Sequence, residues 1–290
     1  MKVTTLNRLA ERYDYFLVDQ FGVLLDADGA YPFAAQTLAR LAAMGKRIIL
    51  LSNSGKRAAV NIDRIKGHGI ARNSFETMLT SGEVAFDYLQ REIGHSLPNG
   101  ARVWLMSRGG DTSAVDGLDV RLAASPDQAD LVFLSGCDVE NTTLDEFKTA
   151  LRPAAQKGTP CLCSNPDLIQ SIKGGFSFGT GRIAQIYAQM GGPVMWIGKP
   201  HPMIYDAAYT LLGRPDPARV LCIGDSPGHD ILGGQQAGFA TALVRTGIHA
   251  GLDEAALQAE CNKAGAMPDY ILSAFTFEEQ EAETCPSHYR

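Results

Sequence analysis

The sequence lacks features that define several whole classes of protein. None of its apolar runs reaches about 18 residues, the length that a membrane-spanning helix needs, so no membrane partner is expected. Basic residues are not in excess: 26 Lys and Arg stand against 32 Asp and Glu, for a net charge of −6. A protein that binds the nucleic-acid backbone usually carries a basic excess or stripe. We therefore expect no nucleic-acid partner.

Cysteine is scarce as well, at six of 290 residues. Six scattered cysteines are too few for a disulfide scaffold, and Cys161 and Cys163 form the only close pair in the sequence. We expect most of them to be buried and reduced. The first residues, from Met1 to Phe16, carry charges where a secretory signal would have a continuous apolar core. The sequence therefore predicts a cytoplasmic location.

What the sequence does contain is an alternation of short apolar runs with helical patterns. This rhythm predicts an α/β fold with a Rossmann-like, doubly wound parallel sheet. At roughly 150 residues per domain, the length suggests about two domains. The expected strands are Tyr15–Val18, Ile48–Leu51, Val103–Met106, Leu131–Leu134, Pro160–Cys163, Val194–Ile197, Val220–Ile223 and Thr241–Val244, with a short one near Val120. Residues 174–181 are glycine-rich and indicate a linker, and the polar tail after Phe275 is expected to be poorly ordered.

Polar residues stand at the ends of four of these strands, where open parallel sheets bind their ligands. Asp19 ends the first strand and Ser52 the second. Lys199 follows a later strand, and Asp225 ends another, with Asp230 five residues further on. Two carboxylates that converge at a strand end suit a hard cation such as Mg²⁺.

Each of these residues also fits a purely structural role. Asp19 could cap a turn, Ser52 could cap the helix after it, and Lys199 could be a solvated loop lysine. Asp225 and Asp230 could be a capping and a surface aspartate. The functional alternative for Ser52 is an anion site, made by its hydroxyl and the backbone N–H groups of Asn53 and Ser54 at a helix start.

Taken jointly, the order Asp, Ser, Lys, Asp and Asp on successive strand ends resembles the four-motif signature of the haloacid dehalogenase superfamily. The long insertion between Ser52 and Lys199 resembles the α/β cap of its class IIA, the group of nucleotide, phosphoglycolate and pyridoxal phosphate phosphatases. Within it, residues 165–167 look like the Asn-Pro-Asp segment of those caps, and residues 136–138 resemble their Gly-x-Asp strand end. The resemblance covers residues 13–250. It implies a catalytic core of residues 1–81 and 179–290 with an inserted α/β cap of residues 82–178, hinged at 81–82 and 179–181.

The resemblance also implies an activity, that of a hydrolase acting on a small phosphorylated metabolite. Asp19 matches the nucleophile, which forms an aspartyl-phosphate that water then hydrolyses. Ser52 matches the residue that hydrogen-bonds the phosphoryl group, and Lys199 matches the lysine that steadies nucleophile and phosphate. Asp138 and Asn165 fall in the cap loops that set specificity, so they are expected to bind substrate, as are Asn53 and Ser54.

The cofactor that the resemblance implies is Mg²⁺. Asp225 matches a metal ligand, and Asp19 contributes both to the metal and to the chemistry. The backbone carbonyl of Phe21 matches the third protein ligand, and Asp230 matches a carboxylate that supports the metal site. A cation and a lysine together would offset the repulsion between an anionic nucleophile and an anionic phosphate.

Phe21 is a departure from the pattern of the superfamily. Its phosphatases usually carry a second Asp two residues after the nucleophile, which protonates the leaving oxygen and later activates water. General acid–base help of this kind is worth about 10²–10⁴-fold in rate. Asp26, Asp28 and His201 are candidate substitutes. The purely structural alternative for Phe21 is a packing residue near the strand end.

Two other functions stay open at this point. Dehalogenases of the superfamily also carry an aromatic residue two positions after the nucleophile, as Phe21 does here, but they need no Mg²⁺. A catalytically weak protein that binds phosphorylated ligands is the other alternative. The oligomeric state is open too, a homodimer included.

Overall fold

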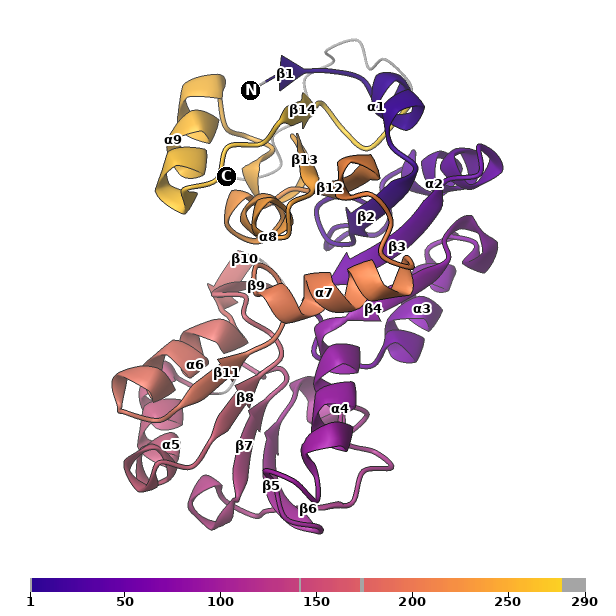
Figure 1. Ribbon diagram of the computed structural model, residues 1–290. Helices are drawn as coiled ribbons and strands as arrows, with labels where there is room; N and C mark the ends of the chain where they lie inside the picture. Colours follow the sequence, from indigo (N-terminus) through magenta and orange to yellow (C-terminus); the bar gives the residue numbers. More distant parts are fainter. Residues whose placement is uncertain (1, 141, 173–174, 278–290) are drawn as a thin grey trace. The chain divides into compact units, whose positions relative to one another are not determined.

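The computed structural model describes residues 2–140, 142–172 and 175–277 of the chain (Figure 1). These fall into two compact units. The first comprises Met1–Ser52, Ile62–Met78 and Tyr205–Arg290, and the second comprises Asn53–Asn61 and Leu79–Ile204. Three elements run from one unit into the other: α3 (Ala58–Gly67), β4 (Thr77–Thr80) and α7 (Pro202–Leu211). The division into a catalytic core and a cap at residues 82 and 178 stays a prediction.

The first unit is built on a sheet that has seven strands within the described residues. Their order is β1-β14-β13-β12-β2-β3-β4, and the pairings from β1 through to β3 are all parallel (Figure 1). Chain order reverses between β2 and β12, which makes this the switch point of a doubly wound sheet. The strands are β1 (Lys2–Val3), β2 (Tyr15–Asp19), β3 (Arg47–Ser52), β12 (Val220–Gly224), β13 (Ala240–Val244) and β14 (Tyr270–Leu272), besides β4.

Helices pack on both faces of this sheet, so its central strands are buried. One core joins Phe16 and Val18 of β2 and Leu50 of β3 to apolar residues of α1 (Leu6–Arg12) and α2 (Ala34–Ala43). Another joins Leu243 of β13 to α9 (Glu254–Ala264), which follows α8 (Leu232–Gln236) in the chain. Burial on both faces explains why these strands appear in the sequence as continuous apolar runs rather than as an alternation.

The second unit has its own parallel sheet, with the strand order β11-β8-β7-β5-β6 in the described residues. Helices α5 and α6 pack together against one face of it. A separate antiparallel hairpin pairs β9 with β10. The elements are α4 (Ser81–Glu92), β5 (Ala101–Met106), β6 (Val120–Leu122), β7 (Leu131–Leu134), α5 (Leu144–Lys157), β8 (Cys161–Cys163), β9 (Ile169–Ile172), β10 (Gly175–Phe178), α6 (Thr180–Gln189) and β11 (Val194–Trp196).

The structure confirms the expected α/β class and corrects two local expectations. Residues 175–178 of the expected linker form β10, because they pair along their length with β9. The strand at Val194–Trp196 lies in the part of the chain that the resemblance assigns to the catalytic core, but it pairs with β8 in the second sheet. Cys137, Cys161, Cys163, Cys222 and Cys261 are free and buried, as expected. The expectation for the tail falls largely on residues 278–290, outside the described residues.

An ion cluster ties together the starts of three central strands of the first sheet. Asp14 precedes β2, and its carboxylate accepts hydrogen bonds from Arg219 Nε at 2.8 Å and Lys46 Nζ at 3.1 Å. Arg219 and Lys46 stand just before β12 and β3. The hydrogen bond from Arg219, more than the one from Lys46, holds the pKa of the Asp14 carboxyl below its usual range.

Asp14→Asn should lower the free energy of unfolding by less than about 1 kcal/mol at pH 7, because this carboxylate is partly exposed to solvent. A carboxyl with a lowered pKa in the folded state stabilises above its unfolded pKa of about 3.9 and loses that effect as the pH falls through its folded value. Urea unfolding of both proteins should therefore show a difference at pH 7 that disappears at low pH. An equal difference at both values would contradict this ion-pair role.

Candidate active site

Three neighbouring strands of the first unit end in polar residues that were expected at the site. Asp19 is the last residue of β2, Ser52 is the last residue of β3, and Asp225 directly follows β12. Because β12, β2 and β3 are parallel neighbours, these side chains stand at the same edge of the sheet. That edge includes the switch point between β2 and β12, where doubly wound sheets bind their ligands.

Three carboxylates gather at this edge. One oxygen each from Asp19, Asp225 and Asp230 lies within 4.8 Å of the others. All three side chains are nearly buried, with relative exposures of 9%, 5% and 4%. Carboxylates brought this close in a poorly solvated place repel one another unless a cation offsets their charge. Oxygen donors of this kind fit the preferences of Mg²⁺, so the residues present suit the expected ion.

Backbone contacts hold the two later carboxylates in place. Asp225 Oδ2 accepts a hydrogen bond from the N–H of Ile248 at 2.9 Å, and Asp230 Oδ2 accepts one from the N–H of Ser226 at 3.2 Å. Two glycines leave room for Asp225: a Cβ on Gly22 or on Gly247 would come within about 2 Å of its Oδ2. Both have positive φ angles, +81° and +71°, which side chains rarely allow. The loop at Gly247 carried no signal in the sequence that could place it here.

Phe21 does not fit the purely structural alternative, a packing residue near the strand end. Its side chain is 40% exposed, and the Arg64 guanidinium carbon lies 5.2 Å from the centre of its ring. Arg64 also donates from Nη2 to Gln20 Oε1 at 3.0 Å. The position at which the resemblance implies an acidic group is therefore occupied by an accessible ring beside a cation. The reason is local: Phe21 lies outside β2, where the chain turns at Gly22.

The remaining expected site residues belong to the second unit. Lys199 follows β11 and is 3% exposed. Asp138 accepts hydrogen bonds from the N–H of Gly109 at 3.1 and 3.0 Å, one on each oxygen. Asn165 Oδ1 accepts the N–H of Asp167 at 3.2 Å, and Ser54 Oγ accepts a hydrogen bond from the N–H of Lys56 at 3.3 Å. These contacts are within the chain, and a substrate role for Asp138 and Asn165 stays a prediction.

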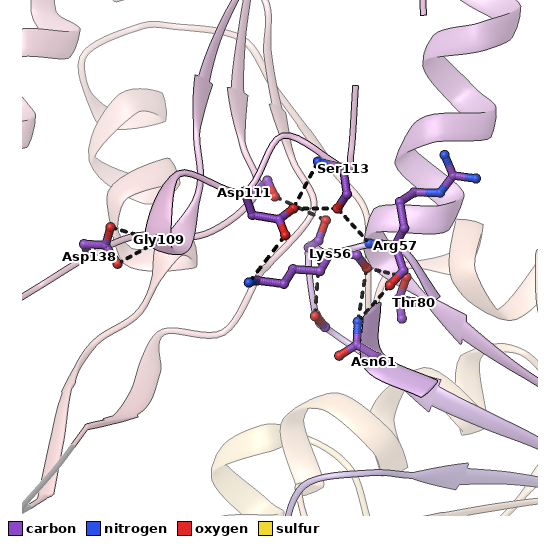
Figure 2. Close-up of polar contacts among 11 residues, drawn as sticks. Lys56, Arg57, Asn61, Thr80, Gly109, Asp111, Ser113 and Asp138 are labelled. Atoms are coloured by element: carbon purple, nitrogen blue, oxygen red, sulfur yellow. Dashed lines mark hydrogen bonds and ion pairs between the residues drawn. The ribbon is translucent and has the colours of Figure 1, made fainter. Parts of the chain in front are cut away.

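A polar network in the second unit was not predicted from the sequence. Figure 2 shows Lys56 reaching Asp111, with Nζ and Oδ2 3.4 Å apart. The other carboxylate oxygen of Asp111 accepts the N–H of Ser113 at 3.1 Å, and Ser113 Oγ in turn accepts the N–H of Arg57 at 3.4 Å. The loop 108–113 is thus fixed at two points, by Asp138 through Gly109 and by the segment that follows Ser52 (Figure 2).

The first unit thus has a doubly wound parallel sheet with a buried carboxylate cluster at its switch point. This arrangement is typical of α/β enzymes and suits the binding of a cation. Two family models match the chain: one described as haloacid dehalogenase-like hydrolase over residues 16–121, and one described as HAD-hydrolase-like over residues 196–276. The chain belongs to the haloacid dehalogenase-like hydrolases. The expected membership of this superfamily is therefore confirmed.

Individual relatives match over nearly the whole chain. Human chronophin is 26% identical over 283 residues, which cover 94% of this chain and 95% of that protein. Sugar-phosphatase AraL of Bacillus subtilis (strain 168) is 28% identical over 267 residues, covering 89% and 91%. A haloacid dehalogenase-like hydrolase from Brucella suis 1330 superposes with a TM-score of 0.79 at 28% identity, covering 93% of this chain and 98% of that one. In the part of the chain that the structure describes, no helix combines the length and the apolar character needed to cross a membrane.

Asp225→Ala should abolish Mg²⁺ binding, because it removes a carboxylate from the cluster and leaves Asp19 and Asp230 without it. Isothermal titration with MgCl₂ measures this directly. Asp206→Ala is the matched control, since Asp206 is an exposed partner of Arg214 in the same unit. Equal Mg²⁺ affinity in the wild type and Asp225→Ala would place the cation elsewhere.

Proposed function

We propose that this chain is a Mg²⁺-dependent phosphatase that hydrolyses a small phosphorylated metabolite through an aspartyl-phosphate on Asp19. The observation that carries the proposal is the cluster of Asp19, Asp225 and Asp230 at the switch point of the first sheet. Its setting supports it: the chain is a haloacid dehalogenase-like hydrolase, and one relative of similar length is named a sugar phosphatase.

Asp19 is suited to be the nucleophile. It ends a buried strand, so its backbone is fixed, and its side chain keeps 9% of its surface open. A carboxylate oxygen of Asp19 would attack phosphorus while the bond from phosphorus to the leaving oxygen breaks. Water would then attack the same phosphorus, releasing inorganic phosphate and restoring the carboxylate.

Charge neutralisation is the main catalytic problem, because an anionic oxygen must approach an anionic phosphate. The Ser52 hydroxyl and the N–H groups of Asn53 and Ser54 would bind phosphate oxygens, and the Lys199 ammonium would offset their charge. Asp19, Asp225 and the Phe21 carbonyl would hold Mg²⁺, with Asp230 as support. When bound, the ion would supply further positive charge against the phosphate and the nucleophile.

These residues include no evident proton donor for the leaving oxygen. Phe21 has no proton to give, and two of the candidate substitutes are engaged locally. Asp26 Oδ1 accepts the N–H of Asp28 at 2.9 Å, and the ring of His201 stacks on Trp196 with centroids 5.6 Å apart. Substrates whose leaving groups depart without protonation, such as aryl or acyl phosphates, therefore suit the site best.

A second candidate function is favoured by the same residue. With Phe21 in place of an acid, hydrolysis of phosphate esters of ordinary alcohols could be very slow. The chain would then act as a protein that binds phosphorylated ligands. A screen of phosphorylated metabolites with and without Mg²⁺ separates the two. Mg²⁺-dependent release of phosphate supports the phosphatase, whereas tight binding without turnover supports the binding protein. Metal-free turnover of a 2-haloacid would instead reveal a dehalogenase.

Asp19→Asn should remove phosphatase activity by several powers of ten, as loss of the nucleophile does in other enzymes. The amide keeps the shape of the side chain but lacks the nucleophilic charge. Release of nitrophenol from p-nitrophenyl phosphate gives the rate, and circular dichroism verifies the fold. Full activity in a correctly folded variant would rule out Asp19 as the nucleophile.

Phe21→Asp should raise the hydrolysis of an alkyl phosphate about ten-fold or more, within the about 10²–10⁴-fold that general acid–base catalysis contributes. Because the ring is 40% exposed, the substitution avoids the about 3–5 kcal/mol cost of truncating a buried Phe. Phe21→Asn is the matched control, since asparagine has the same shape as aspartate but no ionisable proton. Steady-state rates with glycerol phosphate and p-nitrophenyl phosphate test the idea. Brisk cleavage of glycerol phosphate by the wild type, with no gain in Phe21→Asp, would overturn this role.

A further inference from the structure

The side chain of Asn53, the residue after Ser52, is bound to the backbone of Lys199. Its Oδ1 accepts the N–H of Lys199 at 2.6 Å, and its Nδ2 donates to the carbonyl oxygen of Lys199 at 3.1 Å. Nδ2 also donates to Asp167 Oδ1 at 2.7 Å. All three residues belong to the second unit. One amide therefore brackets both peptide groups of the lysine, across 146 positions of sequence.

This arrangement leaves the Asn53 side chain little capacity for any other role. An asparagine has two amide hydrogens, and both are used, one on Lys199 and one on Asp167. Asn53 and Lys199 are only 7% and 3% exposed, so water cannot easily replace these bonds. If Asn53 binds substrate as expected, it would therefore do so through its backbone N–H rather than its side chain.

Asp167 reinforces the orientation of the amide that the N–H and the carbonyl of Lys199 also require. A carboxylate only accepts hydrogen bonds, so the NH₂ end of Asn53 must point toward it and the oxygen is left for the N–H of Lys199. Asp167 is itself held by a turn, because its N–H donates to Asn165 Oδ1 at 3.2 Å and its carbonyl accepts the N–H of Gly181 at 3.0 Å.

The residue before the lysine is a glycine for a steric reason. Gly198 has a φ of +107°, and a Cβ there would lie 2.9 Å from Asn53 Oδ1 and 2.8 Å from Pro166 Cδ. These are tighter contacts than real side chains make. The chain can bring the peptide of Lys199 against Asn53 because nothing projects from residue 198.

We infer that Asn53 is a positioning residue for Lys199, and that Asp167 acts through Asn53 by reinforcing the orientation of its amide. The inference rests on the proposed function, in which Lys199 neutralises the phosphate. A lysine carries its charge on a flexible stem, so fixing its peptide groups restricts where the ammonium can reach. Misplacement of a charge by about 1 Å can cost about 100-fold in rate.

The first test compares three variants with saturating Mg²⁺ and p-nitrophenyl phosphate. Asn53→Ala should lower kcat by about 100-fold. Asp167→Ala should lower it by about ten-fold, the lower end of the effect of residues that support a directly acting group. The double variant should be no slower than Asn53→Ala, because Asp167 acts only through Asn53. Losses that multiply in the double variant would overturn the role of Asp167.

The second test exchanges donor and acceptor. Asn53→Asp places two carboxylates together and should be as slow as Asn53→Ala. Combined with Asp167→Asn, the pair regains its hydrogen bond with the roles reversed, and part of the lost kcat should return. Failure of the combined variant to exceed Asn53→Asp would contradict the inference. These variants also decide the question if Asn53→Ala does not fold.

Asn61→Ala is the matched control. Asn61 lies in the same segment and is 2% exposed, but it donates to the carbonyls of Arg57, at 3.0 Å, and Lys56. Its loss should lower thermal stability and leave kcat within about two-fold. Mg²⁺ affinity, measured by calorimetry, should be unchanged in all variants, because the carboxylate cluster belongs to the first unit.

Different results would contradict the proposed phosphatase function and the positioning role of Asn53. A wild type that binds Mg²⁺ but cleaves no phosphate ester would defeat the proposed function itself. An active wild type whose folded Asn53→Ala variant keeps its kcat would defeat only the positioning role.

Discussion

Repulsion among three nearly buried carboxylates is the constraint on which the rest of the site depends. Asp19, Asp225 and Asp230 are held within 4.8 Å of one another by strand ends, backbone N–H groups and close-packed glycines. A fold does not gain stability from such a cluster by itself. The cluster is explained if a cation binds there. The positive charge of that cation at the edge of the sheet would in turn favour the binding of a phosphate ester.

In the second unit, too, a charged side chain is buried and held in place by its neighbours. Lys199 is buried, and its position is set by the side chain that follows the Ser52 strand end. The segment from Asn53 to Asn61 also carries Lys56 and Arg57, which hold the loop around Asp111 (Figure 2). This short stretch of chain thus contacts both the lysine and a loop near the expected specificity residue Asp138. In the proposed function, phosphate binding by Lys199 and the placement of the loop around Asp111 would share this one structural support.

The sequence predicted what depends on local pattern. Asp19, Ser52 and Asp225 could be placed because each follows an apolar run at the edge of a parallel sheet. It could not predict that β11 joins the second sheet, since the run at Val194–Trp196 specifies a strand but not its partner. The contacts of Gly247 with Asp225 and of Asn53 with Lys199 also escaped, because they join residues far apart in sequence. Phe21 was noticed as a chemical departure, but its exposure depends on the turn after β2.

The most direct test of the central claim is to look for the phosphorylated enzyme. Wild-type protein mixed with Mg²⁺ and p-nitrophenyl phosphate, and quenched in acid during turnover, should carry one phosphoryl group on the peptide that contains Asp19. Mass spectrometry of the peptides would locate it, and Asp19→Asn provides the blank. A phosphoryl group found on another residue, or rapid turnover with no phosphorylated Asp19 at any time, would contradict the proposal.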